Sequence, residues 1–154
     1  MDTICSYLAY DHARCDNLFV QAVAHVAARE WPRALKRTGD FESAFARHME
    51  MEESIIFRAL EGVIGTPDGP TADLRKEHEL LRGLLARVSQ AVQDRKIVDF
   101  FDFADTFRIM MRQHSLKEEG ILYPMADRML ADQRADLVAS MVAISIVHHA
   151  PSMA

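Results

Sequence analysis

The chain has 154 residues, of which 49% are hydrophobic and 27% are charged, and this is the composition of a globular domain rather than a disordered or collagen-like chain. Its net charge of −5 provides no basic surface that could neutralise phosphates, so we expect no nucleic-acid partner. No apolar run approaches the roughly 18 residues of a membrane span, and we expect no membrane partner either.

The N-terminus and the cysteines indicate the cellular compartment in which we expect the protein. The N-terminus has neither the basic region nor the apolar region of a signal peptide. Cys5 and Cys15 would lie about three turns apart on one helix, which is too far for a disulfide. Reduced thiols are typical of the cytoplasm, and we expect a cytoplasmic protein.

Long helices are favoured by the placement of glycine and proline. The chain has 6 glycines and 5 prolines, and five of these residues fall in positions 62–70, so the remaining sequence is nearly free of helix breakers. A first helix is predicted from about Thr3 to Glu30, ended by Pro32 and a solvated basic turn over residues 33–37. Its apolar face carries Cys5, Leu8, His12, Cys15, Phe19, Ala22 and Val26.

Two further amphipathic segments follow. The second is predicted to begin near Asp40, which can act as its N-cap. Its stripe consists of Phe41, Phe45, His48, Glu52, Ile55, Ala59 and Val63. Residues 65–70 form a loop, and Thr71 is predicted to cap the third helix. The stripe of that helix consists of Leu74, His78, Leu81, Leu85, Val88 and Val92.

The fourth segment follows residues 94–96, and Pro124 should kink or interrupt it. Its stripe consists of Phe103, Phe107, Met110, His114, Glu118, Ile121, Met125 and Met129. A shorter segment from about Asp132 to His148 can cover the end of the bundle or form a dimer contact. The terminal His148 and His149 can bind metal adventitiously.

These elements predict an all-α fold, an antiparallel up-down four-helix bundle with an additional C-terminal helix. We expect a single domain over residues 1–154, with the bundle at about 3–130 and the C-terminal helix at about 132–149. A homodimer through the C-terminal helix is a possible assembly.

Six polar residues stand inside the apolar stripes, where leucine or isoleucine would be expected. They are His12, His48, Glu52, His78, His114 and Glu118. A buried carboxylate or imidazole is expensive unless it is paired, hydrogen-bonded or bound to a metal. Because all four helices contribute, the six side chains are predicted to meet in the middle of the bundle.

Two glutamates follow one another after each of His48 and His114, and helical geometry indicates which of the two belongs to this set. Glu52 follows His48 by four residues and lies on the same face, whereas Glu53 is rotated away by about 140°. The same holds for Glu118 over Glu119 after His114. Glu53 and Glu119 are interpreted as solvated or outer groups. Asp11 and Glu77, each next to a histidine of the set, are interpreted in the same way.

An internal repeat supports the set. His12 and His48 are 36 residues apart, as are His78 and His114, and both halves are offset by 66 residues. The offset also relates Glu52 to Glu118, and Ile55-Ile56-Phe57 to Ile121-Leu122-Tyr123. Two similar hairpins facing each other would provide two half-sites, an arrangement that suits two metal ions sharing bridging carboxylates.

The donor types restrict the metal. Imidazole with carboxylate suits iron, manganese or zinc, and disfavours copper(I) or iron–sulfur clusters. Four nitrogens, four carboxylate oxygens and an oxo bridge would give two irons about ten of the roughly twelve donors of two octahedra. One or two positions would stay open for dioxygen, nitric oxide, peroxide or water.

Other side chains near these six are interpreted as structural. Tyr7 and Tyr10 lie within two turns of His12 and are interpreted as packing or interface residues, although either can donate to a metal-bound oxygen. Cys15 is interpreted as a small core residue. His25 has no counterpart in the repeat, since the offset position is Ala91, and is interpreted as structural or exposed.

The motifs resemble the hemerythrin-like, or HHE cation-binding, proteins. The resemblance rests on Asp11-His12, His48-Met49-Glu50-Met51-Glu52-Glu53, Glu77-His78 and His114-Ser115-Leu116-Lys117-Glu118-Glu119, and it covers about residues 5–130. It implies a four-helix bundle with a non-haem di-iron centre, two oxo- or hydroxo-bridged iron ions for which zinc or manganese are possible substitutes. Some hemerythrins place the fourth-helix carboxylate one residue later, so Glu119 is a reserve ligand.

One position departs from the oxygen-carrying hemerythrins. They have a fifth histidine one turn before the third-helix ligand, and this chain has Leu74 there. The missing nitrogen opens a coordination position, which disfavours stable dioxygen carriage and favours redox, sensing or iron-handling roles.

We therefore expect a protein that binds dioxygen or nitric oxide at a di-iron centre, for storage, sensing or detoxification, rather than an enzyme. The alternative is a di-iron oxidoreductase acting on peroxide or nitric oxide, or an iron–sulfur repair or iron-handling factor. A third hypothesis is a structural bundle with incidental histidines. A ferritin-like site is excluded, because no glutamate precedes a histidine by three residues.

Overall fold

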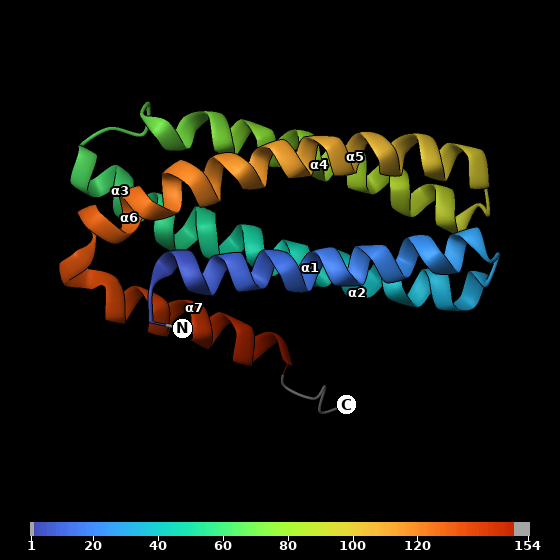
Figure 1. Cartoon of the computed structure of the whole chain (residues 1–154), viewed down its shortest axis with the longest axis horizontal. Coiled ribbons are helices and arrows are strands. Elements are labelled where there is room, and N and C mark those ends of the chain that lie inside the picture. The colour runs from blue at the N-terminus through green and yellow to red at the C-terminus, as the bar shows by residue number, and fades with distance from the viewer. Residues whose placement is uncertain (1, 150–154) are drawn as a thin grey trace.

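The computed structural model describes residues 2–149 and, within them, the side chains up to residue 146, so those of His148 and His149 lie outside the described part. Four long helices form a bundle in which successive helices run in opposite directions (Figure 1). They are α1 (Ile4–Ala27), α2 (Trp31–Glu50), α4 (Pro70–Gln93) and α5 (Ile97–Lys117). No strand occurs within residues 2–149, which confirms the predicted all-α fold.

Two of these helices continue through a π-helical turn into a short helix. α2 passes through η1 (Met51–Ile56) into α3 (Phe57–Ile64), and α5 passes through η2 (Glu118–Leu122) into α6 (Tyr123–Met129). Pro124 lies in the first turn of α6, so the predicted interruption is present. Because η1 has the same geometry without a proline, Pro124 alone does not explain it.

The π turns correct the predicted stripes. A π turn contains one more residue than an α turn, so the buried face moves along the sequence by one position after Glu52 and after Glu118. The residues buried beyond these glutamates are Ile56, Phe57 and Leu60 in one half and Leu122, Tyr123, Ala126 and Leu130 in the other. The residues expected there and found exposed are Val63 (48%), Ile121 (63%) and Met129 (41%).

The predicted start of the second helix is also wrong. α2 begins at Trp31 and not near Asp40, so the basic residues 33–37 lie on a helix and not in a turn. Pro32 lies in the first helical turn, where a missing N–H is tolerated because that group has no partner within the helix. Proline therefore starts α2 rather than merely ending α1.

The predicted cap of the third long helix is wrong as well. Gly69 is the N-cap residue of α4, and the hydroxyl of Thr71 instead donates to the carboxylate of Glu61 in α3. Asp127 in α6, 66 positions after Glu61, accepts from the N–H of Ile4 at the start of α1 at 2.8 Å. The short helix α3 thus contacts the first turn of α4, and the short helix α6 contacts the first turn of α1.

The two hairpin turns repeat the same geometry. Arg29 joins α1 to α2 and Arg95 joins α4 to α5, and both have a φ of 55°. In both turns the N–H of the next residue donates to the carbonyl five residues earlier. The 66-residue repeat is therefore present in the backbone as well as in the sequence.

The apolar core has two parts. The first, toward the hairpin turns, is rich in phenylalanine, and its rings include Phe19, Phe41, Phe45, Phe100 and Phe107. The second, toward the short helices, includes Ile4, Leu8, Met51, Leu60, Leu74, Leu122 and Tyr123. Along each long helix, the polar residues of the predicted set fall between these two parts.

The C-terminal helix packs on the second part of the core. After η3 (Ala131–Gln133), α7 (Arg134–His149) turns back along α1 and α2 (Figure 1) and buries Met141. The hydroxyls of Tyr7 and Ser145 lie 3.1 Å apart. α7 thus covers this end of the bundle, as one of the two expected roles requires. No helix among the described residues combines the length and apolar character needed to cross a membrane.

Candidate metal centre

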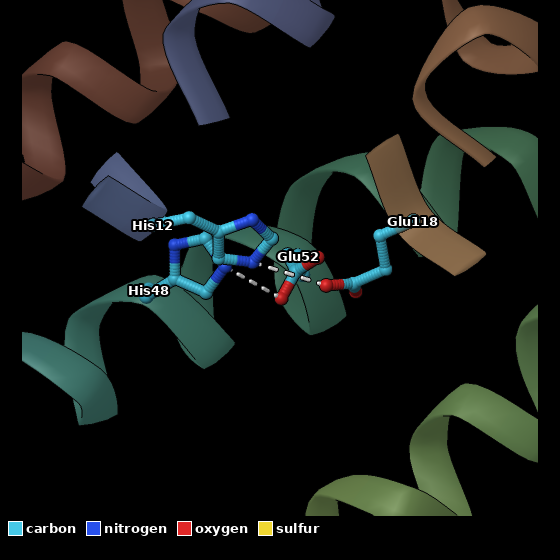
Figure 2. A group of neighbouring side chains, drawn as sticks. All are labelled: His12, His48, Glu52 and Glu118. Atoms are coloured by element: carbon cyan, nitrogen blue, oxygen red, sulfur yellow. Dashed lines mark ion pairs between the residues drawn. The ribbon is translucent and has the colours of Figure 1, made fainter. Parts of the chain in front are cut away.

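The structure brings all six predicted residues together, and each is at most 4% exposed. They form two groups that share both glutamates, and within each group the potential ligand atoms lie within 4.8 Å of one another. The first group is His12, His48, Glu52 and Glu118, and the second is Glu52, His78, His114 and Glu118. Figure 2 shows the first group, with its histidines from α1 and α2 facing the two carboxylates.

A second layer of carboxylates orients the four imidazoles. Each histidine has its Nδ1 atom next to a carboxylate: His48 next to Asp11 at 2.8 Å, His78 next to Glu53 at 2.9 Å, His114 next to Glu77 at 3.1 Å and His12 next to Glu119 at 3.2 Å. A carboxylate accepts, so each Nδ1 carries a proton, and in the neutral form of each ring Nε2 then presents its lone pair to the centre.

This layer confirms the interpretation of the four acidic residues as outer groups. Glu119 belongs to neither group that can hold a metal, and its contact is with the far side of the His12 ring. The structure therefore gives Glu118, and not the reserve residue Glu119, a place at the centre. The π turns let neighbouring glutamates serve both layers, because Glu52 and Glu118 begin or lie within them.

Basic side chains hold three of the outer carboxylates in their ionised form. Burial raises the pKa of Asp11, but the hydrogen bonds from His48 and Arg14 lower it by a larger amount. The pKa of Asp11 therefore lies below its usual value. The pKa of Glu53 also falls, against the effect of burial, because Arg82 and His78 donate to it. An ionised carboxylate is the better acceptor for an Nδ1–H group.

Glu77 completes this pattern. Its pKa is lowered, again against burial, by Lys117 and His114, and the Lys117 ammonium lies 2.9 Å from it. Of the four outer carboxylates, Glu119 has no ion pair with lysine or arginine among the described residues, and its side chain is 39% exposed. The His12 edge is therefore the least enclosed part of the outer layer.

Several atoms at the centre lack the partner that burial demands. No donor among the described residues satisfies His48 Nε2, Glu52 Oε1 or Glu118 Oε2. The Nε2 atoms of His78 and His114 face each other at 3.1 Å, and in the neutral rings both would present lone pairs. Buried acceptors without a donor are strongly destabilising, and a cation between them would satisfy all of them. The donor set fits iron, manganese or zinc.

The residue that sequence reasoning missed is Tyr123. Its hydroxyl donates to Glu52 Oε2 at 2.8 Å and lies 3.2 Å from His12 Nε2 and 3.3 Å from Glu118 Oε1. Burial first, and then the two carboxylates, raise the pKa of Tyr123 well above its usual range, so the hydroxyl keeps its proton. The available signal was the internal repeat, which pairs Tyr123 with Phe57 and so singles out one hydroxyl.

The other neighbouring residues have the structural roles expected of them. Tyr7 contacts Ser145, and Tyr10 is 60% exposed, so neither hydroxyl is at the centre. Cys15 is buried in the first part of the core, and burial raises the pKa of its thiol to about 11. His25 lies near Glu30 at the hairpin turn, away from the centre.

A pocket lies beside the centre on the side of His12. It has a volume of about 620 Å³ and lies between α1 and α5, with His12 and Glu119 among its lining residues. Phe19 and Phe107 contribute apolar walls, and Arg112 contributes a charged one. A small molecule entering from solvent would meet the His12 edge first.

The comparisons with known proteins give one family and no individual relative. No curated protein matches the chain, and no solved structure does. The family model described as the hemerythrin HHE cation-binding domain matches residues 3–141, which include both groups of the centre and α1 to α6. The chain therefore belongs to the hemerythrin HHE cation-binding family.

Proposed function

We propose that the protein holds two iron ions at this centre and binds a small ligand there, dioxygen or nitric oxide, for storage, sensing or detoxification. The six residues His12, His48, Glu52, His78, His114 and Glu118 would hold the ions. Bound iron would supply the redox chemistry and the site at which such a ligand attaches. Zinc and manganese are the alternative metals for the same donors.

The observation that carries this proposal is the set of buried acceptors without donors. Among the described residues, no hydrogen bond reaches His48 Nε2, Glu52 Oε1 or Glu118 Oε2. A histidine with a purely structural role in a core normally has both ring nitrogens satisfied. Either both form hydrogen bonds within the protein, or one does so and the other is exposed to water. Here each Nδ1 is satisfied, and the Nε2 atoms converge.

The chain's own residues prepare the site in two ways. The outer carboxylates fix the imidazole tautomers before any metal arrives, so little reorganisation is needed for binding. The two shared glutamates place negative charge between the groups, which offsets the repulsion of two nearby cations. The pocket beside His12 supplies a path for a small ligand.

A second candidate, a di-iron oxidoreductase or iron-handling factor, is favoured by two residues. Leu74 is buried, one turn before His78, and provides no ligand atom. Tyr123 places a protonated hydroxyl inside the centre. A position without a protein ligand and a nearby proton donor suit turnover of peroxide or nitric oxide.

The deciding experiment combines metal analysis with optical spectroscopy of protein purified with and without air. We expect about two irons per chain and an absorption band of the ferric centre that changes when dioxygen or nitric oxide is added. Stoichiometric, reversible changes support ligand binding, whereas catalytic consumption of peroxide or nitric oxide supports the second candidate. Protein that takes up no iron, manganese or zinc would refute the centre.

The expected homodimer is a separate proposal. α7 turns Met141 inward and leaves Val142 and Ile146 at 38% and 65% exposure, which provides apolar surface for a second copy. The mass measured by light scattering during gel filtration tests it, and a monomer at all concentrations contradicts it. The cytoplasmic location stays a prediction.

A further inference from the structure

Tyr123 and Phe57 occupy equivalent places in the two halves of the centre. They are 66 positions apart, and each follows a π turn as the first residue of a short helix. The Tyr123 ring lies beside His12 with centroids 5.7 Å apart, and the Phe57 ring lies beside His78 with centroids 5.6 Å apart. The rings therefore pack alike, and the hydroxyl is the chemical difference between them.

The hydroxyl of Tyr123 donates its one hydrogen bond to Glu52. Three acceptors lie near the oxygen, and Glu52 Oε2 is the closest at 2.8 Å, against 3.2 Å for His12 Nε2 and 3.3 Å for Glu118 Oε1. A hydroxyl donates one hydrogen bond, and the bond to an ionised carboxylate is the stronger choice. Oε2 of Glu52 is thereby engaged by the protein.

The hydroxyl lies near one oxygen of each glutamate, and the contact with Glu52, at 2.8 Å, is shorter than the contact with Glu118, at 3.3 Å. Glu118 directs Oε1 toward His12 Nε2 at 3.2 Å and Oε2 toward His114 Nε2 at 3.1 Å, one oxygen to each group. Glu52 has only Oε1 without a hydrogen bond, and this atom lies 3.1 Å from His48 Nε2 and 3.4 Å from His78 Nε2.

On the basis of the metal centre proposed above, we propose that Tyr123 is a positioning residue that restricts Glu52 to one coordinating oxygen. Four histidine nitrogens and three carboxylate oxygens then remain for the two ions. This proposal replaces the sequence-based expectation of four coordinating carboxylate oxygens with three. The position that Oε2 of Glu52 would otherwise fill stays available to an external ligand.

The test compares Tyr123→Phe with the wild type and with Tyr7→Phe. Phenylalanine fits at the equivalent position 57, and Tyr7 loses a hydroxyl that contacts Ser145 and not the centre. Iron-loaded ferric protein is titrated with sodium azide and followed by optical absorption. We expect unchanged iron content in all three proteins and azide binding about tenfold weaker in Tyr123→Phe alone, because freed Oε2 competes for the position.

Infrared spectroscopy of the loaded proteins provides a readout that loss of packing would not change. The wild type should show carboxylate stretching bands of both one-oxygen and two-oxygen glutamate binding, and Tyr123→Phe should lose the first kind. This measurement on the wild type tests the proposal even if the variant is unstable.

Three results have distinct meanings. Equal azide affinity with equal infrared bands refutes the role of Tyr123 and leaves the metal centre intact. A phenolate-to-iron absorption band that disappears in Tyr123→Phe also overturns it, because Tyr123 would then bind iron directly. Failure of the wild type to take up metal refutes the proposed function itself.

Discussion

The N-terminal half of the bundle, from α1 to α3, and the C-terminal half, from α4 to α6, share a donor pattern but differ in what surrounds it. In both, a π turn follows the second histidine, and an outer carboxylate binds every Nδ1. The differences lie around the ring of His12, which has Tyr123 on one side and the pocket and Glu119 on the other.

His78 has a different environment. Its ring lies beside Phe57, which has no hydroxyl, and its outer carboxylate Glu53 is held by Arg82 at 2.7 Å. The two halves therefore share the residues that could hold metal, and they differ at single positions beside the His12 and His78 rings.

Removing the metal from both halves should have the largest effect. Bound metal at about a thousand times its dissociation constant stabilises the folded state by about 4 kcal/mol, which corresponds to a fall of roughly 10 °C in Tm after chelation. Differential scanning calorimetry with and without a chelator measures the change. Metal-free protein that melts no lower would instead support a bundle with incidental histidines.

Removing one imidazole from either half should have the second largest effect. His48→Ala acts on the first group and His114→Ala on the second, and each should lose about one ion per chain and lower the Tm of loaded protein. His25→Ala, which lies at the hairpin turn, serves as the control and should keep its metal. Unchanged iron content in both test variants would refute the ligand assignment.

Weakening the outer layer should have a smaller and unequal effect. Glu53→Gln removes the carboxylate that Arg82 holds against His78, and Glu119→Gln removes the more exposed one beside His12. We expect metal affinity to fall about tenfold or more for Glu53→Gln and by less for Glu119→Gln. Glu79→Gln, which contacts Arg82 but no histidine, is the matched control for competition titrations.

Equal losses in both outer-layer variants would contradict the difference between the halves. Equal losses in the Glu79→Gln control would mean that the surface charge, and not the orientation of the imidazole, sets the affinity.

Adding a nitrogen to the second half should have the smallest effect on metal content. Leu74→His would fill a coordination position and slow the loss of bound dioxygen or nitric oxide. Because Leu74 is buried in the second part of the core, the variant should also be less stable without metal. Stopped-flow traces identical to those of the wild type would count against an open position there.

Much of the centre could be predicted because its residues are polar at positions where the pattern of the helix calls for apolar side chains. His12 and Glu52 are polar at positions where the helical period demands an apolar side chain, and the 66-residue offset makes chance an inadequate explanation. The split between inner Glu52 and outer Glu53 also followed from helical geometry.

Three features lay beyond that reasoning. The π turns change the period within a helix, so Ile121 was assigned to the core although it is exposed. Pro32 follows the end of one helix and also lies in the first turn of the next, and the sequence does not distinguish these sites because proline is compatible with both. The hydroxyl of Tyr123 reaches the centre only because the turn before it rotates the chain.

The connection between the two halves has a mechanical consequence. Residues 65–69 are the covalent link between α3 and α4, whereas Glu52 and Glu118 each take part in both groups of the centre. An ion bound there would act as a removable cross-link through the middle of the molecule. In the loaded protein, the hairpins should therefore open as one cooperative unit, and a chelator should make that opening more gradual.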